Sequence, residues 1–205
     1  MKKELNVRLK LWAVTGTILL GFIAVFIFSS AGVKQTANQG PGSADSIIYY
    51  QNMKGPLLGY ATGSGVKLIK QNGLYFKDLN KDGKLDKYED WRLPLDQRIK
   101  DLVSKLSIEQ LSGLMLYSLH QAIPGKVLVA TYSGKPFPES RAEPSDLSDQ
   151  QKLFLQKDNI RHVLITAVSS PSDAALWNNK AQAFVEGLGM GIPVNTSSDP
   201  RHSVD

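Results

Sequence analysis

Oxygen-bearing side chains recur at a regular spacing between residues 78 and 89. In the segment DLNKDGKLDKYE they occupy the first, third, fifth, ninth and twelfth positions, and a glycine occupies the sixth. Calcium takes about six to eight oxygen ligands, and a loop with this spacing wraps short side chains around the ion. The sequence therefore predicts a Ca²⁺ site whose ligands are Asp78, Asn80, Asp82, the carbonyl of Lys84, Asp86 and Glu89.

The same residue types also form Asx-turns, in which short side chains bond to the backbone and no metal is needed. We favour calcium, because the match extends to the glutamate at the twelfth position. The residues before the loop, 73–77, are predicted to be extended, and Pro94 ends any helix after the loop early. The predicted ion is therefore structural and does not belong to a paired calcium sensor.

A second group of charged side chains follows an apolar segment near position 200. Residues 192–196 are predicted to form a buried strand, and Asp199, Arg201 and His202 come soon after it. In parallel α/β folds, ligands bind outside the carboxyl ends of the strands, so this pattern predicts a binding pocket. The alternative is that Asp199 and Pro200 are the N-cap and the first residue of a helix.

The elements expected to position this second group alternate between strand and helix. A strand is predicted at 162–167, a helix at 171–187 with a cap and a first-turn proline, and the strand at 192–196. This order forms one β/α unit with a parallel return. Trp177 shares the apolar stripe of the helix, so we expect it in the core.

Helical signals also follow the predicted calcium loop. The apolar spacing predicts a helix at 95–106, and a capping box at Ser107 begins a second one. A strand is predicted at 114–117, before a long loop rich in proline, glycine and serine at 124–146. Another capping pattern, at Ser148, begins a short helix.

Two segments of weaker pattern precede the loop. Residues 47–77 contain short β-type runs separated by glycine turns, which predicts a small antiparallel lead-in. Residues 34–46 are rich in small and polar residues and show no apolar period, which predicts a flexible linker.

The first 33 residues have the composition of a membrane-targeting segment. No residue from 11 to 33 is charged, whereas four basic residues precede this run. The run predicts a membrane-spanning helix with its N-terminus in the cytoplasm. Small residues at 29–31 also fit a cleavable signal peptide. We expect either a single-pass cell-membrane protein with an extracytoplasmic domain or a secreted one.

The basic charge of the chain is concentrated in this leader. The net charge is +5 and the pI is about 9.3. Residues 1–33 hold four bases and one acid, so the remaining 172 residues have 20 basic and 18 acidic side chains. Nucleic-acid binding needs a dense basic surface, so a nucleic-acid partner is not indicated.

Four segments of the chain resemble the N-terminal part of a glycoside hydrolase of family 3, of the β-glucosidase kind. They are FKDLNKDGKLDKYEDWRLP from Phe76, LDQRIKDLVSKLSIEQLSGLM from Leu95, ALWNNKAQAFVEGLGMGIPV from Ala175, and SSDPRHS from Ser197. Together they extend from about residue 73 to residue 205, in the order found in the family. The first 70 residues carry none of the resemblance.

The resemblance implies an α/β fold containing part of a (β/α)8 TIM-type barrel. The expected regions are the leader at 1–33, the linker at 34–46, a lead-in with the calcium loop at 47–94, and the first part of the barrel at 95–205. A whole barrel needs about 250 residues, so we expect a truncated one.

The resemblance also implies a β-glycoside oligosaccharide as the substrate. Asp199 would bind hydroxyls of the sugar next to the scissile bond, with Arg201 and His202 supporting it or lining the pocket. Trp91 and Trp177 are the aromatic residues that could stack on a sugar, although we favour a core position for Trp177. A retaining glycosidase needs a nucleophile and an acid/base, and in this family both lie downstream of the motif, so no catalytic residue is assigned here. A noncatalytic, membrane-tethered calcium-binding module stays open as the alternative function.

Overall fold

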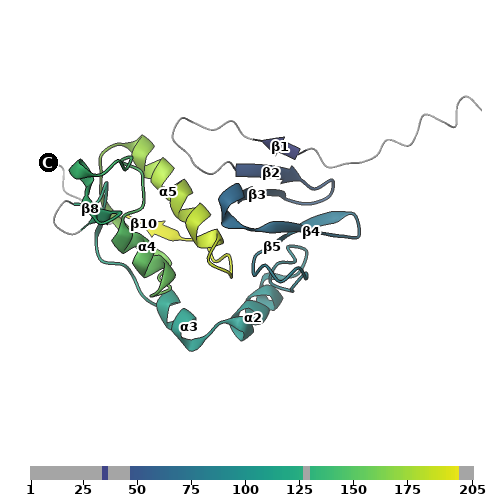
Figure 1. The fold of residues 1–205 in the computed structure, drawn as a ribbon. Coiled ribbons are helices and arrows are strands. Elements are labelled where there is room, and N and C mark those ends of the chain that lie inside the picture. The colour runs from purple at the N-terminus through teal and green to yellow at the C-terminus, as the bar shows by residue number, and fades with distance from the viewer. Residues whose placement is uncertain (1–33, 37–46, 127–129, 199–205) are drawn as a thin grey trace, which may run out of the picture. The chain divides into compact units, whose positions relative to one another are not determined.

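A computed structural model describes residues 34–36, 47–126 and 130–198 of the chain. The elements in these ranges are β1 (Lys34–Thr36), β2 (Ile47–Gln51), β3 (Leu57–Ala61), the 3-10 helix η1 (Thr62–Ser64), β4 (Lys67–Gln71), β5 (Leu74–Asp78), α2 (Leu95–Lys105), α3 (Ile108–Leu114), β6 (Gln121–Ile123), β7 (Thr131–Tyr132), β8 (Lys135–Pro136), the 3-10 helix η2 (Phe137–Glu139), α4 (Asp149–Gln156), β9 (His162–Val168), α5 (Pro171–Glu186) and β10 (Asn195–Ser197). Figure 1 shows their arrangement.

The strands before the loop pair in antiparallel fashion, as predicted. One sheet has the order β1-β2-β3, and β4 and β5 form a separate hairpin. Asn72 and Gly73 close that hairpin with φ values of 52° and 76°, the left-handed conformation that a two-residue turn of this kind requires. Residues 34–36, predicted as part of a linker, pair with β2 instead, and β3 is a strand that the sequence patterns did not reveal.

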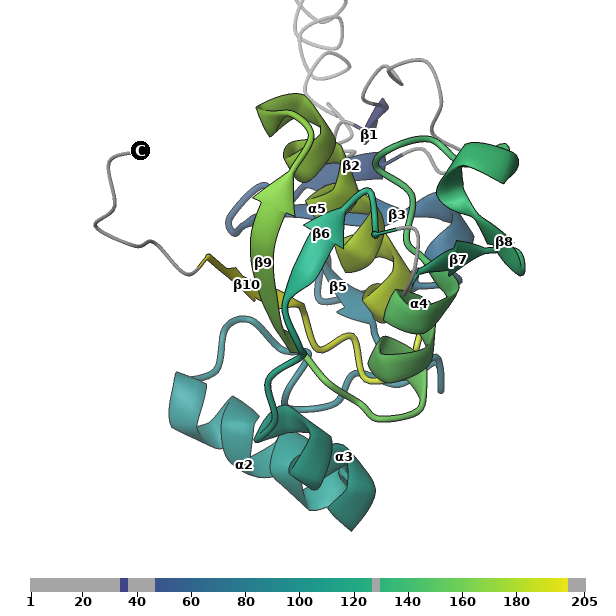
Figure 2. The same ribbon diagram turned by 90° about the vertical axis from the view of Figure 1, so that its left-hand side faces the viewer.

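The strands of the second half form a small parallel sheet with the order β10-β9-β6. Figure 2 shows these strands with α5 behind them. The unit β9-α5-β10 therefore has the parallel return that was predicted from its sequence. Because the strands share one direction, the ends of β6, β9 and β10 point toward the same edge of the sheet.

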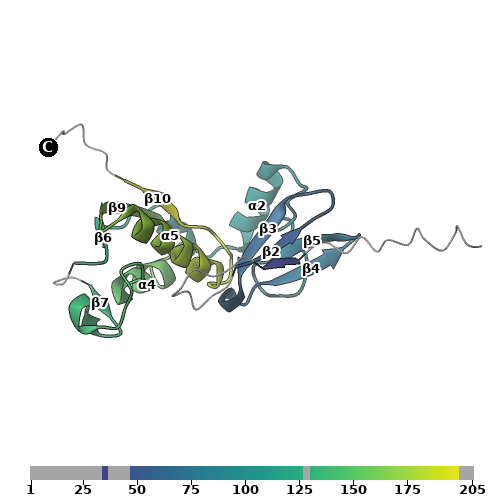
Figure 3. The same ribbon diagram turned by 90° about the horizontal axis from the view of Figure 1, so that it is seen from above.

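Local sequence signals account for the position of α5. Ser170 is its N-cap and accepts a hydrogen bond from the Asp173 N–H at 3.0 Å, Pro171 is its first residue, and Gly187 is its C-cap. One face of the helix buries Trp177, Ala181 and Val185 in a cluster that also includes Ile123, Leu147, Leu155, Val163 and Val194. Figure 3 shows the carboxyl end of α5 directed toward the antiparallel strands, where it contacts β3 and η1.

The predicted fold class is wrong, because the described residues form several small separate sheets with four α-helices and contain no closed barrel. Residues 114–117, predicted as a strand, are the end of α3 and the turn after it. Tyr117 makes only an isolated parallel bridge with His162, and β6 takes the place beside β9. The capping box at Ser107 begins a helix that continues to Leu114, so the first residue of the predicted strand is helical and the chain turns at Met115.

The strand predicted at 192–196 is also shorter and more exposed than expected. Only residues 195–197 form β10, which pairs with β9 on one side and has no other partner strand in the described part of the chain. Val194 is buried, whereas Asn195 and Thr196 are exposed. An edge strand has only part of its surface covered, so a continuous apolar run is not needed there.

The predicted membrane-spanning segment, 11–33, lies outside the described residues. Within the described ranges, none of the helices is both long and apolar enough to cross a bilayer.

A polar network lies inside the core between α4, α5 and β6. Gln151 is 1% exposed and belongs to the capping box of α4, where its Oε1 accepts from the Ser148 N–H at 3.0 Å. The same oxygen accepts from the Trp177 indole N–H at 3.0 Å, and the Gln151 amide lies 3.2 Å from Gln121 Oε1. One buried amide thus satisfies polar groups of three elements, as a buried network must.

We predict that Gln151→Leu destabilises the protein by roughly 1 to 3 kcal/mol, because it leaves the Trp177 and Ser148 N–H groups without acceptors. In a Trp177→Phe background the same change should cost less, since the indole N–H is already gone. Urea unfolding of the four proteins of this double-mutant cycle measures both effects. Gln156→Leu, at an exposed position of the same helix, is the control, and equal losses for both glutamine variants would contradict the prediction.

The hairpin β7-β8 is held to α4 by one carboxylate. Asp149 accepts hydrogen bonds from the Thr131 hydroxyl at 2.7 Å and from the N–H groups of Gly134 and Ser133 at 2.9 and 3.0 Å. These bonds, and that from Gly134 most of all, hold the pKa of the Asp149 carboxyl below its ordinary value.

The pKa of Asp149 is lower in the folded state than in the unfolded chain, so its carboxylate stabilises the folded state. This stabilisation is fully present above the unfolded-state pKa of Asp149, and it is lost as the pH falls through the folded-state pKa. We predict that Asp149→Asn costs roughly 1 to 3 kcal/mol at neutral pH, and that the difference from wild type shrinks toward zero in acid. Urea unfolding across the acid range measures it. Asp158→Asn, an exposed change, is the control, and a difference independent of pH would contradict this role.

Candidate functional site

The side chains at the predicted calcium positions hold the backbone of their own loop. Asp78, the last residue of β5, accepts the Gly83 N–H on Oδ2 at 3.1 Å. Asn80 Oδ1 accepts the Asp82 N–H at 3.1 Å, and Asp82 Oδ1 accepts the Lys84 N–H at 2.8 Å. Gly83 has a φ of 76°, so the sharp turn in the loop uses the left-handed conformation that glycine adopts without strain.

Glu89 closes the loop from its other end. Its Oε1 accepts the Leu79 N–H at 2.7 Å and the Asn80 N–H at 3.3 Å, while Oε2 accepts the Asp86 N–H at 3.0 Å. The residue is 4% exposed, and burial raises the pKa of its carboxyl although the three backbone bonds act in the opposite direction. Residues at both ends of the loop are thus joined through one buried carboxylate.

Not all oxygens of the loop have partners. Asp78 is 3% exposed, and its Oδ1 is a buried atom without a hydrogen bond. Asp86 is paired on both oxygens, with the Asn80 amide at 2.8 Å and the Lys105 ammonium at 2.9 Å. As the side chains lie, no three acidic, histidine or cysteine residues of the described chain converge as a metal cluster. The calcium ligands therefore stay a prediction.

The loop packs against the segment that connects α5 to β10. The Lys81 ammonium donates to the Gly187 carbonyl at 2.8 Å. A Cβ atom added to Gly191, which has a φ of 62°, would come within 2.6 Å of the Leu79 side chain. Gly191 thus allows the close approach of the two segments, and a larger residue there would push the loop away.

The residues predicted to bind sugar, Asp199, Arg201 and His202, lie outside the described part of the chain. The strand that leads to them, β10, ends at Ser197, which pairs with Leu164 in the middle of β9. At the carboxyl end of β9, the Asp173 carboxylate accepts from the hydroxyls of Ser169 and Ser170, and the Ser169 bond leads in lowering its pKa. These two hydrogen bonds of the Asp173 carboxylate stabilise the first turn of α5.

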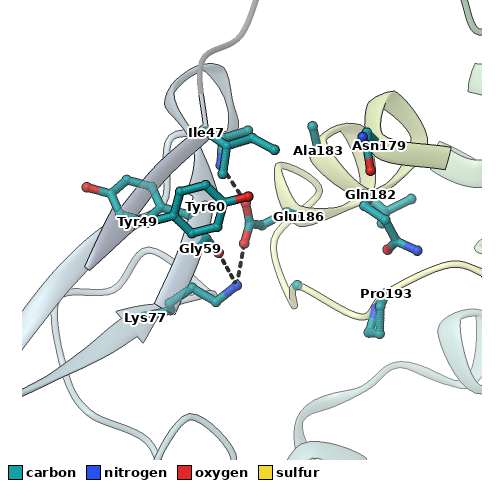
Figure 4. A pocket seen from close by; sticks show the side chains of 13 residues that line it. Ile47, Tyr49, Gly59, Tyr60, Lys77, Asn179, Gln182, Ala183, Glu186 and Pro193 are labelled. Atoms are coloured by element: carbon teal, nitrogen blue, oxygen red, sulfur yellow. Dashed lines mark hydrogen bonds and ion pairs between the residues drawn. The ribbon is translucent and has the colours of Figure 1, made fainter. Parts of the chain in front are cut away.

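A cavity that the sequence did not suggest lies between α5 and the antiparallel strands. Its volume is about 280 Å³, and Figure 4 shows the side chains around it. Lys77 and Glu186 form an ion pair of 2.5 Å at its edge. Glu186 also accepts the Ala61 N–H at 3.1 Å, and Lys77 donates to the Gly59 carbonyl at 3.1 Å. No sequence signal connects these two residues, because they are 109 positions apart.

The cavity is not at the edge of the sheet where the sugar-binding residues were predicted. Gly191 and Pro193, which line it, precede β10, and Glu186 is the last residue of α5. They therefore lie toward the amino ends of the parallel strands. In α/β folds, substrates bind at the opposite end, so the Lys77–Glu186 pair serves mainly to hold α5 on the antiparallel strands.

The aromatic rings that could stack on a sugar pack against other residues of the protein. Trp177 is 1% exposed and belongs to the core, as expected. The Trp91 ring stacks on Phe76 with centroids 5.3 Å apart, and its indole N–H donates to the Tyr75 carbonyl at 3.0 Å. His162 stacks on Tyr117 with a centroid distance of 5.1 Å, at the start of β9.

Known proteins are similar to this chain over longer segments than the four sequence motifs. No family model matches the chain. A periplasmic beta-glucosidase/beta-xylosidase of Dickeya chrysanthemi is 39% identical over 141 residues, which cover 68% of this chain and 19% of that protein. A probable beta-glucosidase C of Aspergillus oryzae is 22% identical over 116 residues, 57% of this chain and 16% of that protein. A protein of the same name from Aspergillus flavus matches equally well.

The chain belongs to glycoside hydrolase family 3. The order of its motifs corresponds to the N-terminal region of a family 3 enzyme, as predicted. The chain spans about a fifth of the length of the curated relatives that it matches.

The prediction of a single-pass cell-membrane protein needs correction. The described part of the chain offers no spanning helix, and the printed name of the Dickeya relative describes a periplasmic protein. The membrane contact predicted for residues 11–33 falls outside the described residues.

We predict that Glu186→Gln destabilises this family 3 protein by roughly 1 to 3 kcal/mol, since Lys77 then keeps its charge in a half-buried position without its carboxylate partner. Chemical denaturation measures the loss. Glu143→Gln, at an exposed position, should change stability by less than about 0.5 kcal/mol. If the two variants were equally stable, the ion pair would not hold α5 in place.

Proposed function

We propose that this chain forms the N-terminal, sugar-binding part of a glycoside hydrolase. The whole enzyme removes terminal β-D-glucosyl or related β-glycosyl groups from oligosaccharides, with retention of configuration. The observation that carries this proposal is the 39% identity over 141 residues with the Dickeya protein, whose printed name contains both beta-glucosidase and beta-xylosidase.

The direction of the parallel strands supports a role for the residues after β10. The chain leaves β10 at Ser197 toward the edge at which β6 and β9 also end. Asp199 follows two residues later, so it is close in sequence to the edge where α/β proteins bind ligands. This edge lies away from the Lys77–Glu186 cavity, and we do not assign substrate binding to that cavity.

The chemistry of a carboxylate suits sugar recognition. An ionised aspartate accepts hydrogen bonds on both oxygens, and charge-assisted bonds are about twice as strong as neutral ones. Asp199 binds neighbouring hydroxyls of one pyranose ring, while Arg201 and His202 orient Asp199 or line the pocket. This assignment rests on the resemblance of SSDPRHS to the family motif.

The nucleophile and the acid/base are proposed to lie in polypeptide beyond this sequence. Retaining glycosidases place these two carboxyl groups about 5 to 5.5 Å apart. Within the described ranges, three acids of the loop at 78–89 bond to the loop backbone, Asp86 pairs with Asn80 and Lys105, and Asp173 bonds to the N-cap residue of α5. The 205-residue chain alone should therefore release no aglycone from an aryl β-glucoside.

We predict that the complete gene product hydrolyses an aryl β-glucoside or β-xyloside, and that Asp199→Asn lowers kcat/KM by roughly 100-fold or more, because charged hydrogen bonds to the sugar are lost. Proton NMR of the first product should show the β-anomer, as retention requires.

Asp158→Asn, at an exposed position outside the motif, is the matched control and should leave kcat/KM unchanged. An inactive complete product would contradict the proposed function. Full activity of Asp199→Asn would contradict the role of that residue, and release of the α-anomer first would contradict retention.

A further inference from the structure

We propose that the loop at 78–89 binds one calcium ion, which fastens the connection between α5 and β10. The predicted ligands alone do not carry this proposal, because their hydrogen bonds would also occur in a metal-free turn. The deciding observation is Asp78. Its side chain is 3% exposed, and Oδ1 is the side-chain oxygen or nitrogen that the described residues leave both buried and without a partner.

The two oxygens of Asp78 have different surroundings. Oδ2 accepts the Gly83 N–H at 3.1 Å, which directs the carboxylate into the turn of the loop. Oδ1 has neither a hydrogen-bond donor nor water access, and an unsatisfied buried carboxylate oxygen is costly. A cation bound at Oδ1 removes this cost, and the first position of a calcium loop supplies a ligand of this kind.

The remaining ligand positions keep acceptor capacity after their hydrogen bonds to the backbone. Each carboxylate has about four lone-pair sites, and an amide oxygen has two. Asn80 and Asp82 each use Oδ1 for one backbone N–H, and Glu89 accepts three. These bonds fix the loop with Gly83 at its sharpest point, so a short movement brings the side chains together around the ion.

One existing contact involves a predicted calcium ligand. Lys105 now neutralises Asp86 at 2.9 Å, and Asp86 also accepts the Asn80 amide at 2.8 Å. Asp86 holds the ninth position, which often reaches calcium through a water molecule, so this pair can persist or loosen without loss of the site. Magnesium suits the loop less well, because it requires a smaller, strictly octahedral set of ligands.

The ion has a structural effect beyond the loop. Lys81 donates to the Gly187 carbonyl at 2.8 Å, and Leu79 packs against Gly191. Both contacts hold the segment that leads from α5 into β10. Calcium therefore stiffens residues 78–89 together with 187–191, and it positions the strand from which the SSDPRHS motif follows.

Isothermal titration of the 205-residue chain with CaCl₂ after chelator treatment tests this proposal. We expect one ion per chain and a rise in Tm of roughly 5 to 10 °C at saturating Ca²⁺, with little effect of Mg²⁺ at the same concentration. Hydrogen exchange of the wild-type chain should slow at 78–89 and 187–191 when Ca²⁺ is added, and this readout needs no variant.

Asp78→Asn is the decisive variant, with Asp158→Asn as its control. The amide oxygen still accepts the Gly83 N–H, but the charge at Oδ1 is gone, so we expect at least a tenfold loss of Ca²⁺ affinity and no calcium-dependent rise in Tm. The control should bind like wild type. These readouts do not depend on glycosidase activity, so they fail or succeed separately from the proposed function.

Two results would overturn the proposal. The first is the absence of binding heat and of any Tm change in the wild-type chain at roughly 10 mM Ca²⁺, a concentration above the dissociation constants of weak extracellular calcium modules. The second is an unchanged calcium response in Asp78→Asn, which would place the ion elsewhere.

Discussion

The structure depends on the packing of α5 against β9. Trp177, Ala181 and Val185 are almost fully buried, and Val163 of β9 lies in the same cluster with no exposed surface. Removing a buried tryptophan typically costs about 3 to 5 kcal/mol, which is a large part of the stability of a domain. Because the helix crosses from the end of β9 back to the start of β10, this packing determines that the two strands are parallel.

The two ends of α5 contact different parts of the structure. At its first turn, Ser170 and Asp173 complete the cap close to the end of β9. At its last turn, Glu186 bonds to β3 and β5, and Gly187 accepts from Lys81 of the 78–89 loop. The antiparallel strands and the loop are therefore attached to the parallel sheet through one helix. A disturbance at the loop can reach β10 through residues 187–194, the segment that ends at Val194 in the core cluster.

Local patterns predicted local structure well. The capping boxes at Ser107 and Ser148 both form, and the Ser170-Pro171 start of α5 lies where it was expected, since these motifs satisfy backbone groups within a few residues. The turn at Gly83 likewise has the backbone conformation that the calcium pattern requires.

Non-local features were not predictable in the same way. The Lys77–Glu186 pair and the contact of Gln151 with Trp177 depend on the tertiary fold, because they join residues far apart in the sequence. The barrel prediction failed for a related reason: it transferred the architecture of a whole family to a chain that matches about a fifth of its relatives. The helix at 108–114 includes the first residue of the strand predicted at 114–117, and Tyr117 of that segment makes an isolated bridge with His162 of β9.

The proposed function requires that the parallel strands deliver Asp199 to a sugar. A crystal structure of the complete gene product with bound glucose tests it most directly. We expect the Asp199 carboxylate within about 2.5 to 3.0 Å of two neighbouring sugar hydroxyls, at the carboxyl edge of β6, β9 and β10. Glucose bound instead in the cavity beside Lys77 and Glu186, with Asp199 on the outer surface, would contradict the account.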